Sequence, residues 1–197
     1  MKLESAIDRP EAGSPPPDNY RLGAIFFLMA GGMLFAGLIG GYVVLRYSQP
    51  AWPAPGMPPL PVGLAGFNTG VIALSSLALA RAVRALRGLD ALSLRRGLFL
   101  AAFLGAAFLA LQVVQWTHLV AGGLSFAGTT YGSTFYLITG VHAAHALSGV
   151  AWLLTIALRQ RELWVPEPRR RAIEVCALYW HFVGLVWAGI YVALYLL

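Results

Sequence analysis

Five long blocks without a single Asp, Glu, Lys or Arg constrain the fold of this chain more than any other feature. Each block holds about 19 to 25 residues, and a helix rising about 1.5 Å per residue crosses the roughly 30 Å hydrocarbon layer over that length. None of the twelve prolines falls inside a block, so no breaker interrupts a continuous helix. The sequence therefore predicts an all-α polytopic membrane protein with five transmembrane helices. The blocks are residues 22–45, 62–80, 97–120, 133–157 and 175–197.

The composition excludes most soluble classes of protein. Of the 197 residues, 58% are apolar or aromatic and only 11% are charged, which is too few charges for the surface of an ordinary soluble domain. The net charge of +6 is concentrated in short connections, where membrane topology explains it better than binding to a nucleic acid. Cys176 is the only cysteine, so the chain can form neither an internal disulfide nor a cysteine metal cluster.

The basic residues predict how the chain lies in the membrane. Residues 1–20 carry charges of both signs and three consecutive prolines, and we expect them to form a polar cytoplasmic tail ahead of a membrane domain at residues 21–197. Of the 14 Lys and Arg residues, 13 lie before the first block or in residues 81–96 and 159–171, and the opposite side has only Arg46. Because positive residues favour the cytoplasmic side, the amino terminus is predicted in the cytoplasm and the carboxyl terminus in the periplasm.

Small residues recur every four positions within three of the blocks. In lipid, where apolar side chains gain little by facing each other, such rows let two backbones approach closely. Gly37 and Gly41 in the first block and Gly140 in the fourth are therefore predicted to lie at close helix contacts. The alternative is that glycine and alanine are simply abundant in this sequence. The full rows are Gly32, Ala36 and Gly40; Gly37 and Gly41; Ala102, Ala106 and Ala110; and Gly140, Ala144 and Ser148.

Few ionisable groups fall inside or beside the blocks, and each is a functional candidate because its burial in lipid is costly. His142 and His145 are three residues apart, which places both on one helix face and would suit a metal or a haem. The alternative is that they bond to neighbouring helices or lipid headgroups, as would His181 and Glu174 in or before the fifth block. No carboxylate or thiol is placed to complete a ligand set, so we expect no catalytic, metal or cofactor site in this chain.

Uncharged polar side chains in the second and third blocks allow two interpretations. They could line a cavity, but such groups more often form hydrogen bonds between membrane helices. From the residues alone, the prediction ends at a five-helix bundle without chemistry of its own. The polar set comprises Asn68, Thr69, Ser75, Ser76, Gln112 and Gln115.

Motifs on two consecutive blocks resemble those of subunit III of the haem-copper oxidases. The fifth block contains Tyr-Trp-His-Phe-Val at residues 179–183. The fourth contains Tyr-Gly-Ser-Thr-Phe-Tyr at residues 131–136, followed by Thr-Gly-Val-His-Ala-Ala-His at residues 139–145. The resemblance covers the whole membrane portion, and five spans instead of seven is the form that many bacterial members take. Further similarity to these short members lies at Trp52, Pro53, residues 67–69, Ser75 and Ser76.

The resemblance implies a non-catalytic accessory subunit of a respiratory terminal oxidase that takes electrons from cytochrome c or quinol. Such a subunit packs mainly against subunit I, has subunit II and small subunits as further candidate partners, and encloses phospholipid between helix groups. Haem and copper are then expected in the partner subunits, in the inner membrane of a bacterium, and membership of a respiratory supercomplex stays open. The residues expected to contact lipid or to fix helix packing are His142, His145, Tyr179, Trp180, His181 and Glu174.

Three carboxylates that the family usually has are replaced in this chain. Gly32 occupies the position of a glutamate in the first retained span, and Gln115 occupies that of a second glutamate. Gly184 occupies the position of the aspartate that often follows the Tyr-Trp-His-Phe-Val motif. A buried carboxylate must be paired or protonated, so their loss implies a divergent member that does not handle protons directly. Two alternatives are a subunit-III-like protein of a nitric oxide reductase system and a stand-alone small membrane transporter.

Overall fold

The computed structural model describes residues 19–53, 55–88, 90–160, 165 and 167–197. Within these residues it contains five helices that are long and apolar enough to cross a membrane, as the block pattern predicts. Most of the predicted tail, residues 1–18, lies outside the described residues. The helices are α1 (Asn19–Ser48), α2 (Val62–Arg87), α3 (Ala91–Ala121), α4 (Thr130–Arg159) and α5 (Glu167–Tyr191), which continues into the π-helical turn η1 (Val192–Leu196).

Several helices extend beyond their uncharged blocks at the end predicted to face the cytoplasm. For example, α2 continues to Arg87, although its uncharged block ends at residue 80. The starts of α3 and α4 are set by capping side chains. The Asp90 carboxylate accepts the Ser93 N–H at 3.0 Å, and the Thr129 hydroxyl accepts the Gly132 N–H at 3.1 Å.

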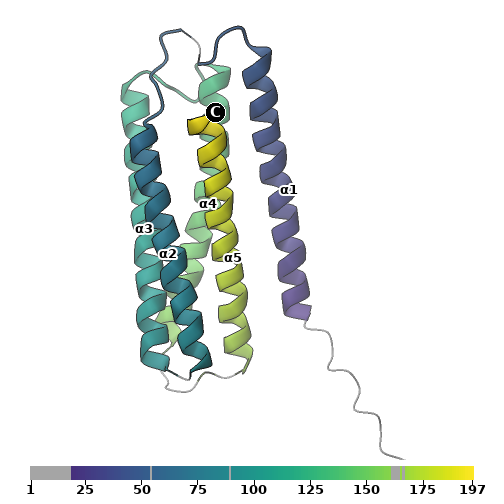
Figure 1. The fold of residues 1–197 in the computed structure, drawn as a ribbon, viewed down its shortest axis with the longest axis vertical. Helices are drawn as coiled ribbons and strands as arrows, with labels where there is room; N and C mark the ends of the chain where they lie inside the picture. Colours follow the sequence, from purple (N-terminus) through teal and green to yellow (C-terminus); the bar gives the residue numbers. More distant parts are fainter. Residues whose placement is uncertain (1–18, 54, 89, 161–164, 166) are drawn as a thin grey trace, which may run out of the picture.

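Helices α2 to α5 form a packed group, and α1 lies at its edge (Figure 1). The most extensive contact joins α2 and α3, while α5 packs against both α2 and α4. Helix α1 contacts α5 and, to a smaller extent, α4. The core therefore lies between α2, α3, α4 and α5, and α1 adds the buried side chains Phe35 and Tyr42 to it.

The closest helix contacts occur where glycines meet side chains of a neighbouring helix. A Cβ at Gly105 of α3 would lie 2.7 Å from the Trp180 ring, and a Cβ at Gly149 of α4 would lie 2.6 Å from the same ring. At Gly97 of α3, the nearest atom would be the Cβ of Ala82 in α2, also at 2.6 Å. Since protein interiors are close-packed, a larger residue at any of these glycines would force the helices apart.

The glycines predicted to make close contacts do not make them within this chain. A Cβ at Gly37, Gly41 or Gly140 would meet no described atom within 4 Å. Close approach inside the chain is instead found at Gly105 and Gly149, because those two face the largest side chain of α5. Packing of Gly37, Gly41 and Gly140 against a partner chain stays a prediction.

Candidate functional site

Trp180 joins α5 to three other helices in the centre of the bundle. Its indole is fully buried between the glycines described above, and its Nε1–H donates to the Ser75 hydroxyl of α2 at 3.0 Å. Ser75 in turn donates to the Ala101 carbonyl of α3 at 2.7 Å. A buried indole N–H needs an acceptor, and here the acceptor also links two further helices.

A second tryptophan, Trp187, makes an equivalent set of contacts two turns further along α5. Its Nε1–H donates to the Thr69 hydroxyl of α2 at 2.9 Å, and its ring meets that of Phe108 in α3 edge to face, with centroids 4.9 Å apart. Asn68 donates to the Phe108 carbonyl at 3.2 Å. Hydrogen bonding between helices, one of the two interpretations of the polar set, is therefore what Asn68, Thr69 and Ser75 do.

His142 lies in the aromatic centre of the bundle. It is 1% exposed, and its ring centroid lies 5.2 Å from Trp187, 5.8 Å from Phe108 and 6.0 Å from Phe35 of α1. Neither ring nitrogen has a hydrogen-bond partner among the described residues. Three helices therefore enclose this imidazole with carbon surfaces.

His145 is partly exposed on the side of α4 that faces α1 and α5. Its Nδ1 lies 2.8 Å from the Val141 carbonyl one turn back, and Phe35 packs against its ring with centroids 5.3 Å apart. Tyr179 of α5 donates to the His145 carbonyl at 3.0 Å, and its hydroxyl also lies 2.8 Å from that of Ser148. Phe35 thus packs against both histidines, but aromatic rings enclose His142, whereas His145 is partly exposed.

Within the described residues, no group of three or more His, Cys, Asp or Glu side chains could hold a metal ion. Cys176 is a buried free thiol in the packed interior. One imidazole without further donors is a weak ligand set for a metal ion.

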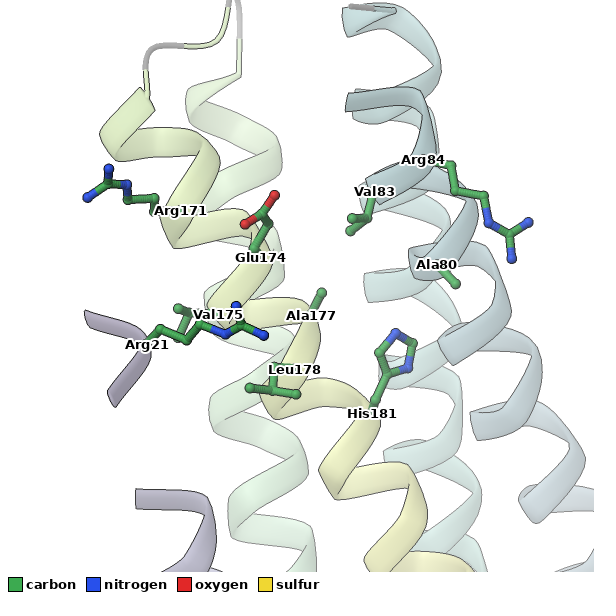
Figure 2. A pocket seen from close by; sticks show the side chains of 10 residues that line it. All are labelled: Arg21, Ala80, Val83, Arg84, Arg171, Glu174, Val175, Ala177, Leu178 and His181. Atoms are coloured by element: carbon green, nitrogen blue, oxygen red, sulfur yellow. The ribbon is translucent and has the colours of Figure 1, made fainter. Parts of the chain in front are cut away.

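A cavity of about 470 Å³ opens between α1, α2 and α5 at the end predicted to face the cytoplasm (Figure 2). In Figure 2, Arg21 reaches from α1 toward α5, and the His181 ring points from α5 toward Ala80 of α2. Charged groups lie near the helix ends and His181 lies deeper. The cavity is lined by Arg21, Ala80, Val83, Arg84, Arg171, Glu174, Val175, Ala177, Leu178 and His181.

The mouth of this cavity is basic. Arg21, Arg84 and Arg171 line it against the single carboxylate of Glu174. That carboxylate is also shared with Arg170, whose Nε lies 3.8 Å away one turn back on α5. The surplus of guanidinium groups favours an anionic occupant, and guanidinium matches the geometry of phosphate.

Two apolar grooves border the same turns of α5. One, of about 330 Å³, lies between α1, α4 and α5, and the other, of about 490 Å³, lies between α4 and α5. Val175 lines both grooves and the basic cavity, so the three spaces are neighbours around one residue. The first groove is lined by Gly23, Ala24, Phe27, Leu28, Trp152, Val175 and Tyr179. The second is lined by Trp152, Glu167, Pro168, Arg171, Ala172 and Val175.

The predicted site residues therefore fall into two groups. His142, His145, Tyr179 and Trp180 belong to the contacts between α4 and α5, and Glu174 and His181 line the basic cavity. The sequence interpretation missed Arg21, Arg84 and Arg171 as cavity residues because it used them only to assign topology. Their common membrane side was readable in the sequence, but their place around one cavity requires knowing that the ends of α1, α2 and α5 are adjacent.

The positions of the three replaced carboxylates are occupied in different ways. A Cβ at Gly32 would lie 3.8 Å from the Phe182 ring, and one at Gly184 would lie 3.1 Å from the Ser76 hydroxyl. Gln115 is fully buried, and its Nε2 donates to the Tyr195 hydroxyl. In place of a carboxylate, the bundle therefore has a neutral hydrogen-bonded amide at Gln115. A side chain at Gly184 would crowd the Ser76 hydroxyl, whereas a Cβ at Gly32 would make only ordinary contact with Phe182.

These features define a class: a multi-pass helical membrane protein whose described interior is devoted to helix packing, with a basic cavity at one end. Comparison with known proteins gives the particular family. A family model described as cytochrome c oxidase subunit III matches residues 16–197. The chain belongs to this family, and it is a subunit III of a haem-copper oxidase.

Three bacterial relatives show how far the similarity extends. The chain is 33% identical over 185 residues to cytochrome c oxidase subunit 3 of Synechocystis sp., covering 92% of this chain and 77% of the relative. It is 34% identical over 180 residues to a probable cytochrome c oxidase subunit 3 of Nocardia farcinica, covering 91% and 88%. With the corresponding subunit of Corynebacterium diphtheriae it is 32% identical over 203 residues, covering 98% of both chains.

Proposed function

We propose that this chain is a non-catalytic accessory subunit of a cytochrome c oxidase in a bacterial inner membrane. It packs mainly against subunit I, with subunit II and small subunits as further partners, and haem and copper lie in those partners. Support comes from the use of the buried His142, Tyr179 and Trp180 in the contacts between helices, and from relatives named for cytochrome c oxidase. No observation favours a nitric oxide reductase system or a stand-alone transporter.

The chain also holds a phospholipid at the cytoplasmic end of α1. The observation that carries this part is the pairing of a basic cavity with apolar grooves around Val175. The lipid phosphate binds Arg21 and Arg171, and an acyl chain lies beside Phe27 and Trp152. The predicted orientation agrees with this arrangement, because positive residues favour the cytoplasmic side and both arginines would then lie at the headgroup level of that leaflet.

Replacing both arginines tests the lipid site. The double variant Arg21→Gln with Arg171→Gln should purify in its complex with less bound phospholipid, because two phosphate contacts are lost. Arg81→Gln is the matched control, since Arg81 is an exposed arginine of the same membrane side that does not line the cavity. Equal phospholipid content in the two preparations, measured by mass spectrometry, would refute the site.

Spectra of the purified complex test the non-catalytic role. Affinity purification through this chain should recover polypeptides that carry haem and copper. The double variant His142→Phe with His145→Phe should leave the haem absorption spectrum unchanged, because neither imidazole is a ligand. Loss of haem or copper from that variant would show that the chain contributes to a redox centre.

A further inference from the structure

A group of buried polar atoms lies unpaired in the outward half of the bundle, which is the half predicted to face the periplasm. Asn68, Gln112, Gln115 and His142 are each no more than 1% exposed. Among the described residues, six of their side-chain atoms have no hydrogen-bond partner: Asn68 Oδ1, both amide atoms of Gln112, Gln115 Oε1 and both ring nitrogens of His142. Neither lipid nor bulk water reaches these atoms, and unpaired polar groups in such surroundings are costly.

Shared neighbours connect these four residues. Asn68 donates to the Phe108 carbonyl, and the Phe108 ring packs against His142. Gln112 lies one turn beyond Phe108 on the buried face of α3, and Gln115 lies one turn further toward the outward end. The unpaired atoms therefore follow a column along the bundle axis rather than four separate places.

The outward end of this column meets a cavity. The Tyr195 hydroxyl accepts the hydrogen bond of Gln115, and Tyr195 lines a cavity of about 270 Å³ beside Arg46. Trp187 packs between Tyr195 and His142, with ring centroids 6.5 Å and 5.2 Å away, so one aromatic side chain spans from the cavity wall to the innermost histidine. Small polar molecules can thus approach the column at Tyr195.

We propose that the column formed by Asn68, Gln112, Gln115 and His142 is an internal water-binding site, supplied from the outward cavity at Tyr195. The six atoms include donors and acceptors but no charged group, which suits neutral water better than an ion. A buried water makes about three hydrogen bonds, so six atoms suit about two water molecules. The waters add polar links between α2, α3 and α4 to the direct bond from Asn68 to the Phe108 carbonyl.

Hydroxyl-radical footprinting by X-ray radiolysis in H₂¹⁸O tests this proposal on the chain in its purified complex. Bound water activated beside a buried side chain labels that side chain, whereas a dry aromatic stays unlabelled. Trp187 and Trp180 form a matched pair, since both are fully buried on α5, but Trp180 lies between glycines and donates to Ser75. Trp187 should incorporate ¹⁸O several-fold faster than Trp180. Equally slow labelling of the two tryptophans would overturn the proposal.

A variant gives an independent second measurement. Gln112→Leu removes two of the six unpaired atoms at nearly constant volume, so labelling of Trp187 should fall toward the rate of Trp180. Unchanged labelling of Trp187 in a folded Gln112→Leu complex would contradict the proposal. The comparison of Trp187 with Trp180 in the unaltered chain does not depend on the stability of this variant.

Discussion

Helix α1 and the group α2 to α5 are built in different ways. Only 6% of the most apolar stretch of α1 is buried in the chain, against 33% for α2 and α3 and 39% for α4 and α5. The four-helix group is joined by close contacts at glycines, as where Gly105 and Gly149 receive the Trp180 ring. Helix α1 instead reaches the group through long side chains such as Phe35, with cavities beside its amino-terminal end.

This difference shows which contacts can hold membrane helices together. In lipid an apolar surface gains little from burial, so van der Waals fit and interhelical hydrogen bonds provide the association. The group α2 to α5 has both, through Trp180 and its bond to Ser75. Helix α1 has fewer of either, and its position therefore depends on what fills the space around it.

The largest expected effect comes from filling a glycine of the packed group. Gly105→Leu should destabilise the chain by about 3 kcal/mol or more, because the new side chain overlaps Trp180 and Val150. Gly37→Leu is the control, since it meets open space in this chain. Thermal unfolding measures both. Equal unfolding temperatures for the two variants would contradict the distinction between the regions.

The Gly37 variant also sharpens the prediction about partner chains. If Gly37 and Gly140 contact another subunit, Gly37→Leu and Gly140→Leu should reduce recovery of the intact complex, while the helix content of the chain stays unchanged. Co-purification yields measure this effect. Full recovery of the complex with both variants would remove these glycines from the partner interface.

A smaller effect is expected at the main side-chain contact of α1. Phe35→Ala should weaken docking of α1 by about 2–3 kcal/mol, at the low end for such a deletion because burial in lipid adds little. Hydrogen exchange should then accelerate in α1 but not in α5. Met33→Ala is the control, because Met33 is 75% exposed on the same helix. Faster exchange throughout the bundle would mean that α1 is an integral part of the packed group.

Within the packed group, removing one hydrogen-bond acceptor should have a measurable cost. Ser75→Ala leaves the buried Trp180 N–H without its acceptor and should reduce stability by about 1–2 kcal/mol. Ser76→Ala tests the neighbouring hydroxyl, which is only partly buried. Tryptophan fluorescence during thermal unfolding reports both changes. A larger loss with Ser76→Ala would show that the bond to Trp180 is not what matters.

The smallest effect is expected at the helix cap between α2 and α3. Ser93 donates to Asp90 and holds the pKa of this carboxyl below its ordinary value. The stabilisation of the folded chain by the Asp90 cap is therefore complete above the ordinary carboxyl pKa of about 3.9. It is lost as the pH falls through the lower pKa that Asp90 has in the folded chain. Asp90→Ala should lower the unfolding temperature slightly at pH 7, and the difference from the unaltered chain should vanish in strong acid. A difference that persists in acid would exclude the carboxylate as its cause.

The spans were predictable from the sequence, and their close contacts were not. Charge-free length determines a transmembrane helix almost alone, so α1 to α4 each contain their predicted block, and α5 with η1 covers all but the last residue of the fifth. Small-residue rows show only where close approach is possible, and Gly37 and Gly105 look alike until the neighbouring helix is known. Nothing in the sequence singled out Gly149, because the Trp180 ring that packs against it comes from another helix, α5.

The candidate site was likewise only partly predictable from the sequence. Polar residues such as Thr69 and Ser75 were predicted to bond between helices, because membrane interiors leave them few other partners. The basic cavity was missed, because Arg21, Arg84 and Arg171 come from three helices whose ends meet only in the folded bundle. Sequence position gives the membrane depth of a residue, but not which helix end lies beside it.

Helices α2 to α5 form a directly packed group, and in the proposed function a phospholipid fixes α1 beside it. Spin labels at Met33 and Leu185 report the distance between α1 and α5, and labels at Leu147 and Leu185 report that between α4 and α5. All three positions are exposed, and Cys176→Ala removes the native thiol. On removal of bound lipid, the distance distribution between α1 and α5 should broaden while that between α4 and α5 stays narrow. An unchanged distribution between α1 and α5, or equal broadening of both, would contradict the account.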